Sequence, residues 1–537
     1  MRLQRSLTRA YLTIDPRSLG AGRIALGLVL LLDLVRRVPV ITLWYSNQGL
    51  MPNHTVLWQP PFPYAFSFFF MASLPNEAAF GFGLCAVAYF MLLVGNRTRL
   101  AHLASLLGVL SLHGRTLFIQ NGGDVTLVEL CVWTLFLPMG RRYSIDSWRG
   151  RRAAPPPPSA EPLTRRDVAP PDGVPVVSLA ALAIVAQLAI IYLFNALQKN
   201  GPTWRKDGSA IHYMLHSEGL VTALGLWVRG WLTPRQSQVL TWAALTIEGL
   251  LPFFLLTPWG QRYARRLAIA LIVALHVGIG LFFNLGIFAP VMIAFTPLLV
   301  TTEDWDSLER WWAKRARLAA DARGATSLGF ARLLPTLERH GLLRLPAPNA
   351  AEAPPWRKSL RARGGLLRES TVALLMIFAT VRTLVDNAAV THVNASLQPR
   401  LVGVTTTYLQ MLQAWLLFAP DAPTTDATVA VDAVTAEGRH VDPLNEVVSP
   451  NHSWLGTEIR PRLGYDAFAN AYLLRLPYYP AYFGAFGEWI LRYPERTGRV
   501  EDRIASFEVI ALDHDNPPPG ERSPRNRRTR LLFKYPE

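Results

Sequence analysis

Long blocks of sequence without ionisable side chains constrain this chain more than any other feature. The stretches 24–32, 180–197 and 267–285 consist almost entirely of apolar residues. The longer two approach the roughly 20 residues that an α-helix needs to cross a bilayer. Hydrophobic residues make up 50% of the chain, whereas only 17% of its residues are charged. These blocks exclude a purely soluble protein and predict a polytopic membrane protein.

Apolar runs between charge clusters predict eight or nine membrane spans. We place them at residues 18–35, 77–95, 101–119, 125–139, 176–197, 237–257, 267–285, 287–300 and 370–389. The fourth and eighth runs are shorter than a usual crossing, and Pro138 and Pro290 lie at their ends. A kinked or re-entrant segment is compatible with both short runs.

The arginines of the loops predict the orientation of the chain. With a cytoplasmic N-terminus, the basic loops at 97–99, 141–166 and 262–266 and the basic region 310–368 all fall on the cytoplasmic side. Cytoplasmic loops are enriched in Lys and Arg, so we expect this orientation. The position of the basic loops explains the net charge of +16 better than binding to nucleic acid would. Arginine strongly outnumbers lysine, which favours a bacterial source and a location in the inner or cell membrane.

The composition changes after the last expected span. Alternating apolar and polar residues at 428–434, 503–510 and 529–534 predict strands, whereas 467–474 and 479–492 predict helices. An odd number of spans places this small α+β domain outside the cytoplasm.

The expected fold is therefore mainly α, a polytopic membrane helix bundle with a small C-terminal extracytoplasmic α+β domain. Its four regions are a transmembrane bundle at 1–300, a basic cytoplasmic linker with an amphipathic helix at 301–369, a last transmembrane helix and interfacial segment at 370–420, and the extracytoplasmic domain at 421–537. Trp305, Leu308 and Trp312 define the apolar face of the linker helix. The proline run 155–158 predicts a stiff connector.

Several ionisable side chains lie inside the expected spans, where each needs a partner or a function. Asp33 and Arg37 have the spacing of an i,i+4 ion pair, for which a structural role is the ordinary interpretation. Arg115 is a candidate partner for either Asp124 or Glu129.

Glu248 and His276 lie near the middle of two consecutive spans. No basic residue shares the span of Glu248, so its carboxylate needs a partner from another helix. Antiparallel neighbours can bring Glu248 to His276 and form a carboxylate–imidazole pair that orients the ring or moves a proton. A purely structural buried hydrogen bond is the alternative.

Lys199 ends the fifth expected span, just before Gly201-Pro202-Thr203-Trp204. A lysine that reaches the membrane interface as a simple anchor is the ordinary interpretation. However, positive residues are disfavoured on the outer side, and an arginine would have supplied plain charge in this lysine-poor chain. Desolvation can give lysine a neutral amine, which is the property of a general base.

Motifs of common soluble enzymes are absent. The sequence contains no phosphate-binding Gly-x-x-x-x-Gly-Lys, no Cys-x-x-Cys and no His-Glu-x-x-His. Cys85 and Cys131 lie inside apolar blocks, where small buried hydrophobic residues are expected rather than ligands. We therefore expect no metal.

The polar residues of the spans, taken together, resemble the HTTM (horizontally transferred transmembrane) family, which includes the vitamin K-dependent γ-glutamyl carboxylases. The resemblance is carried by Asn195-Ala196-Leu197-Gln198-Lys199 through Trp204, by Glu248-Gly249, by His276 through Asn284-Leu285-Gly286-Ile287-Phe288 and Met292, by Ser144 to Trp148, and by Gln413-Ala414-Trp415 with Phe418-Ala419-Pro420. It covers residues 15–300 well and the remainder loosely.

The resemblance implies a carbon–carbon lyase type of activity that uses a reduced quinone similar to vitamin K hydroquinone. In the carboxylases, a membrane-embedded lysine deprotonates the hydroquinone, oxygen is added, and the resulting strong base removes a glutamyl γ-proton so that carbon dioxide can add. Lys199 matches that lysine. The resemblance makes Lys199 and His276 the expected catalytic residues, and Glu248, Trp204 and Asn284 the expected quinone-binding residues. A secreted peptide is the implied substrate, and the bilayer is the other expected partner.

Two departures from the carboxylases keep a second function open. The carboxylases have a further histidine after the third span, where this sequence reads Gln120-Asn121-Gly122-Gly123-Asp124. The outer domain is also smaller than a propeptide-binding carboxylase leads one to expect. Other bacterial members resemble the membrane partner that helps to mature a secreted peptide toxin. The alternative function is therefore a non-enzymatic maturation or export factor for a secreted peptide.

Overall fold

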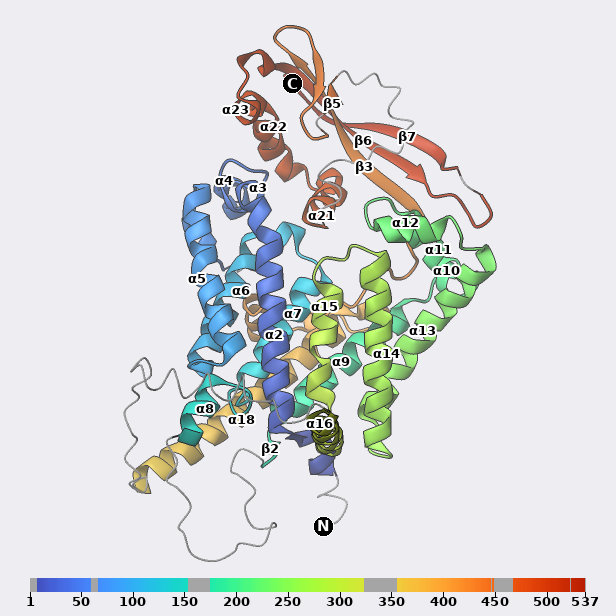
Figure 1. Cartoon of the computed structure of the whole chain (residues 1–537). Helices are drawn as coiled ribbons and strands as arrows, with labels where there is room; N and C mark the ends of the chain where they lie inside the picture. Colours follow the sequence, from blue (N-terminus) through green and yellow to red (C-terminus); the bar gives the residue numbers. More distant parts are fainter. Residues whose placement is uncertain are drawn as a thin grey trace, which may run out of the picture.

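The computed structural model describes residues 7–58, 66–152, 174–322, 355–445, 447–448, 467–521 and 523–536. A bundle of long helices carries a five-stranded sheet at one end, and the first long helix begins at the opposite end (Figure 1). The expected proline connector at 155–158 lies outside the described residues.

A helix occupies each of the nine apolar runs. The long helices are α2 (Pro16–Arg37), α5 (Pro75–Val94), α6 (Thr98–Arg115), α7 (Gly122–Leu135), α9 (Leu179–Gln198), α13 (Pro234–Leu256), α14 (Gln261–Phe282) and α18 (Pro355–Asp386). The eighth run forms the short helix α15 (Phe288–Ala294) and a 3-10 turn at Thr296–Leu299.

Among the described residues, five helices are long and apolar enough to cross a membrane. They are α5, α9, α13, α14 and the part of α18 at Arg363–Asp386. The chain is thus a membrane protein with several candidate spans, while the count of eight or nine crossings stays a prediction. The helices α2 and α6, which contain buried charged residues, and α7, which has only 14 residues, are not among these five.

Local sequence signals fix where these helices begin and end. Pro75 occupies the first turn of α5, and the Glu77 carboxylate accepts hydrogen bonds from the backbone N–H groups of Ser73 at 2.7 Å and Leu74 at 3.0 Å. Gly95 ends α5 with a φ of 69°, a left-handed conformation that favours glycine. At the beginning of α13, the Thr233 side chain caps the helix by accepting a hydrogen bond from the backbone N–H of Gln236.

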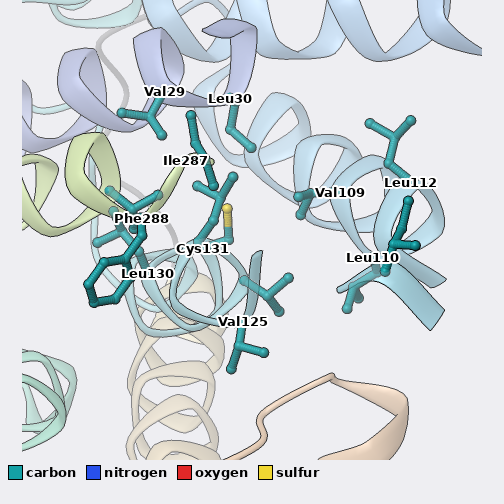
Figure 2. Packing of buried hydrophobic residues seen from close by; sticks show 14 of the residues in the cluster. Val29, Leu30, Val109, Leu110, Leu112, Val125, Leu130, Cys131, Ile287 and Phe288 are labelled. Carbon is teal, nitrogen blue, oxygen red and sulfur yellow. The ribbon is translucent and has the colours of Figure 1, made fainter. Parts of the chain in front are cut away.

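The core of the bundle lies where α2, α6, α7 and the start of α15 meet. Figure 2 shows apolar side chains from these segments converging, among them Leu30, Val109, Leu130 and Phe288. Cys131 belongs to the same cluster, and both cysteines are free and buried, as the sequence predicts. Close helix packing contributes as well, since a Cβ on Gly27 would lie 2.8 Å from the backbone of Leu93.

The amphipathic helix predicted near Trp305 is α16 (Thr302–Ala322). It is tied to the beginning of α2, because Trp305 Nε1 donates to Ser18 Oγ at 2.7 Å and Arg17 pairs with Asp306 at 2.7 Å. Trp312 remains 60% exposed, as expected for a helix on a membrane face. α18 begins at Pro355, well before the expected start of the last span at residue 370, so part of the expected linker is helical.

The C-terminal domain is α+β, as the sequence predicts. Its antiparallel sheet has the order β5-β4-β3-β6-β7. The strands are β3 (Thr425–Thr435), β4 (His440–Asp442), β5 (Val447–Val448), β6 (Ile504–Asp515) and β7 (Arg525–Tyr535), and the principal helices are α21 (Ala467–Arg475) and α22 (Phe483–Leu491). The domain lies at the end of the bundle opposite α8 (Ile145–Arg152) and α16, which carry the basic loops (Figure 1). This arrangement agrees with the expected sidedness, whereas the assignment of one side to the cytoplasm stays a prediction.

Short helices connect α9 to α13 beneath this domain. They are α10 (Pro202–Arg205), α11 (Ala210–His216) and α12 (Ala223–Arg229). The rings of His212 and His216 lie 4.2 Å apart, and His212 Nε2 contacts the carbonyl of Pro517 at 2.8 Å. Burial lowers the pKa of His216 from 6.5 to about 4, and burial also lowers the pKa of His212.

We expect this histidine pair to make the stability of the protein sensitive to acid. A histidine whose pKa is lowered in the folded state binds protons better when unfolded, so its contribution is complete above about pH 6.5 and is lost toward about pH 4. The melting temperature measured across this range should therefore fall as the pH decreases. His216→Gln should flatten the fall, and an unchanged slope in that variant would contradict the assignment.

Candidate functional site

Lys199 and Glu248 form a buried ion pair at the junction of α9 and α13. Lys199 Nζ donates to Glu248 Oε2 at 2.6 Å and to Oε1 at 2.8 Å. Asn195 Nδ2 donates to the same Oε1 at 2.9 Å. Lys199 is 3% exposed and Glu248 is 5% exposed, so both charges are withdrawn from solvent. The ammonium and the carboxylate therefore depend on each other for compensation.

The chain turns sharply after Lys199, and this turn places Trp204 against the lysine. Lys199 Nζ lies 4.3 Å from the centroid of the Trp204 ring, and Trp204 Nε1 donates to the carbonyl of Phe418 at 2.7 Å. Asp421 Oδ1 accepts from the backbone N–H of Thr203 at 2.9 Å. Gly201 allows this approach, because a Cβ there would lie 2.2 Å from the Asp421 carboxyl group. The segment after residue 417 thus fixes the geometry around Lys199.

His276 lies beside this pair but does not bond to Glu248. Its Nδ1 is 2.9 Å from the carbonyl of Ile272, one turn earlier in α14. The ring packs against Tyr192 and Phe288, with centroid distances of 6.0 and 5.4 Å. The expected Glu248–His276 pair is therefore wrong, because the carboxylate is taken by Lys199 and Asn195.

A cavity of about 620 Å³ lies next to this group. Its residues come from the bundle and from the C-terminal domain, and its lining is mainly apolar, with Ile191, Leu285 and Phe288 on the bundle side. Asn284, expected to bind a quinone, is part of the lining, and so is Asn195. Phe288 separates the cavity from His276, since it contacts both.

Asn195 connects the cavity to the ion pair and was missed by the sequence reasoning. Its Nδ2 binds Glu248, while its buried Oδ1 has no hydrogen-bond partner among the described residues. Its position four residues before Lys199 is a usable signal, because i and i+4 side chains share one face of a helix. The free acceptor suits a hydroxyl group of a ligand in the cavity.

A second buried polar cluster is centred on Arg37. The guanidinium donates to Asp33 Oδ2 at 2.9 Å and to Asp124 Oδ1 at 2.8 Å, which confirms the predicted i,i+4 pair. His113 Nε2 approaches the same carboxylates at 3.1 and 3.6 Å. The ligand-type atoms of Asp33, His113 and Asp124 lie within 4.8 Å of one another, as in a metal site. Arg37 already supplies the compensating cation, so these residues do not fit a resident metal.

Arg115 does not pair with either expected carboxylate. Its Nη2 donates to the carbonyl of Met51 at 2.6 Å, Asp124 is bound by Arg37, and Glu129 accepts from Gln413 Nε2 at 2.7 Å. The prediction failed because helix packing decides which long side chain reaches a given carboxylate.

The arrangement has the components of a proton-transfer site beside a hydrophobic cavity. Proton movement from Lys199 Nζ to Glu248 along a 2.6 Å contact would leave an uncharged amine. Lys199 and Glu248 are almost fully buried, so little water reaches the contact between them.

Comparison with known proteins yields one family match. Residues 163–305 match the family model of the HTTM domain. The matched region includes α9, α13, α14 and α15, and hence Lys199, Glu248 and His276. No curated protein and no solved structure matches the chain. The chain is thus a membrane protein in which residues 163–305 are similar to the HTTM domain.

Proposed function

We propose that this protein is a quinol-dependent membrane enzyme that carboxylates or oxygenates a secreted peptide. The observation that carries the proposal is the buried Lys199–Glu248 pair, joined through Asn195 to a mainly apolar cavity. The HTTM match and the likeness of these segments to γ-glutamyl carboxylases support the same function.

The residues of the cavity fit a reduced quinone. About 620 Å³ is within the usual range for a site that holds a small organic ligand. Asn195 Oδ1 offers a buried acceptor for a hydroxyl group, and Asn284 supplies a second polar position. Apolar side chains suit the ring and its hydrocarbon tail. When bound, the quinol would supply an acidic hydroxyl group and the electrons that reduce oxygen.

The roles of the protein groups follow from their contacts. Lys199 becomes a base when its proton moves to Glu248, and Nζ can then accept a proton from a hydroxyl group in the cavity. Glu248 stores the first proton, and Asn195 orients the carboxylate. Trp204 holds Nζ through its ring face. His276 acts through Phe288 and Tyr192 as a positioning residue, because its Nδ1 is committed to Ile272.

The chemistry balances as two coupled reactions. Oxygen oxidises the quinol to its epoxide and water, and a glutamyl γ-proton is replaced by carbon dioxide. In the oxygenation variant, one atom of O2 would enter a C–H bond of the peptide and the other would leave as water, while the quinol would supply two electrons and two protons and become the quinone. The second candidate, a non-enzymatic maturation or export factor, is favoured by the contact of the C-terminal domain with the cavity, since that surface can bind a peptide without chemistry.

Labelled substrate distinguishes the two candidates. Purified protein in lipid nanodiscs would receive reduced vitamin K, oxygen, labelled bicarbonate and a glutamyl peptide, and the mass and label of the peptide would be measured. The proposal predicts added carbon dioxide or oxygen, and its loss in Lys199→Arg, because an arginine side chain stays protonated. A maturation factor would leave the peptide unchanged, tolerate Lys199→Arg in cells, and lose its function on truncation after Pro420.

A further inference from the structure

The outer end of the cavity is formed by the C-terminal domain rather than by the bundle. Asn470, Leu474 and Arg475 of α21 and the following Tyr479 line it. They face Asn121 at the beginning of α7. Figure 1 shows α21 directly above the bundle, so a ligand that enters from this side meets α21 first.

Arg475 places a cation at this end of the cavity. Its Nη1 donates to the carbonyl of Phe118, and its Nη2 donates to the carbonyl of Gln120 at 2.8 Å. The side chain is partly buried, and burial lowers the pKa of its guanidinium. Within the described ranges, Arg475 forms no ion pair. Two bonds to neutral carbonyls leave N–H donors and a positive charge without a counter-ion.

The surrounding charges do not neutralise Arg475. Asp124 acts on it electrostatically, but Arg37 binds that carboxylate at 2.8 Å. Arg36 adds a second cation, because its guanidinium lies 3.4 Å from the position of a Cβ on Gly286, beside Asn121. Positive charge therefore exceeds negative charge among these residues, which favours an anionic ligand.

A further hydrogen-bond donor lies in the same wall. Asn121 Oδ1 caps α7 by accepting from the N–H of Gly123 at 2.8 Å. In the part of the chain that the structure describes, Asn121 Nδ2 donates to no acceptor. Arg475 and Asn121 thus present donors from two sides of one wall, which suits the planar, two-oxygen geometry of a carboxylate.

We propose that Arg475, with Asn121 and Arg36 beside it, forms a carboxylate-binding subsite for an acidic side chain of an extracytoplasmic peptide. The inference deepens the proposed function and rests on it for the peptide nature of the ligand. A carboxylate held at the outer end directs the attached chain toward the part of the cavity where Asn195 meets the Lys199–Glu248 pair. Arg475 is then a specificity-determining residue for glutamate over glutamine.

Peptide binding without turnover tests this subsite. Full-length protein in lipid nanodiscs, without quinol, would be titrated with a fluorescent peptide that contains one internal glutamate and an amidated C-terminus. Its glutamine twin and a glutamine peptide with a free C-terminus would be titrated in parallel. We expect the wild-type protein to bind the glutamate peptide at least about tenfold more tightly than the twin. If only the glutamine peptide with the free C-terminus bound more tightly than the amidated glutamine twin, the assignment of the subsite to an acidic side chain would be overturned.

Three variants separate recognition from structure. Arg475→Gln should reduce binding of the glutamate peptide to that of its twin, whereas Arg475→Lys should keep part of the discrimination through its charge. Arg492→Gln is the matched control, since Arg492 also donates from the C-terminal domain to a backbone carbonyl, that of Asn47, but does not line the cavity. This control should bind as the wild type does.

Several outcomes would overturn the inference. They are equal binding of both peptides by the wild type, discrimination that persists in Arg475→Gln, and an equal loss for both peptides in that variant, which would make Arg475 only a structural contact. Discrimination in this titration, combined with an unmodified peptide in the separate assay with reduced vitamin K and oxygen, would instead refute the proposed chemistry and leave the subsite intact.

Discussion

Glu248→Leu is expected to destabilise the protein by about 3–5 kcal/mol, which is the usual cost of removing one partner of a buried ion pair. Glu248 Oε1 and Oε2 are the acceptors of Lys199 Nζ, at 2.8 and 2.6 Å. Without them, the ammonium would remain buried under Trp204 with no counter-ion. The apparent melting temperature in detergent or nanodiscs, together with the yield of folded protein, measures the effect.

The double variant Lys199→Met, Glu248→Leu separates the stability of the pair from its function. Replacing both charges by apolar groups of similar size removes the uncompensated charge, so the double variant should recover most of the stability lost in Glu248→Leu. It should nevertheless stay inactive, because it has no base. A double variant whose destabilisation equals the sum of those of Lys199→Met and Glu248→Leu would show that the two side chains are not coupled.

Arg37→Met is expected to lower the free energy of unfolding by at least about 3–5 kcal/mol, the amount expected for Glu248→Leu. Arg37 bonds to Asp33, Asp124 and the Tyr45 hydroxyl at 2.8 to 2.9 Å. Its loss would leave two buried carboxylates close together, with His113 and the backbone N–H of Asn121 as the partners that the structure shows. Thermal unfolding and expression level are the direct measurements.

Arg36→Met is the matched control for this prediction. Arg36 is the neighbouring residue on α2, and its guanidinium packs on the ring of Phe468 at 5.2 Å. We expect a change below about 1 kcal/mol in this variant, as for a partly exposed cation–π contact. Comparable losses in Arg36→Met and Arg37→Met would contradict a specific role for the Arg37 cluster.

The sequence predicted most of the elements but not all their limits, and its count of eight or nine crossings stays a prediction. Apolar runs of helical length and alternating strands are local patterns, so α9, α14, β3 and β6 could be found from the sequence alone. The early start of α18 was missed because residues 355–369 are polar and basic, without an apolar run to indicate a helix.

The site was predicted in its residue types but not in its pairing. Lys199 and Glu248 attract attention because charge is costly inside apolar runs. Their pairing depends on how α9 packs against α13, which no local pattern contains. Nothing in the sequence indicated that Arg475 lines the cavity. An arginine at the end of a helix outside the membrane spans is ordinary, and only the fold places it there.

Quinone epoxide formation tests the central claim most directly. Membranes that contain the protein would be supplied with reduced vitamin K and oxygen, without peptide, and the epoxide would be quantified beside a Lys199→Ala control of equal folded yield. We expect epoxide in the wild type and its loss in the control. Absence of epoxide from properly folded protein across several quinols, or equal formation in both proteins, would contradict a base function for Lys199.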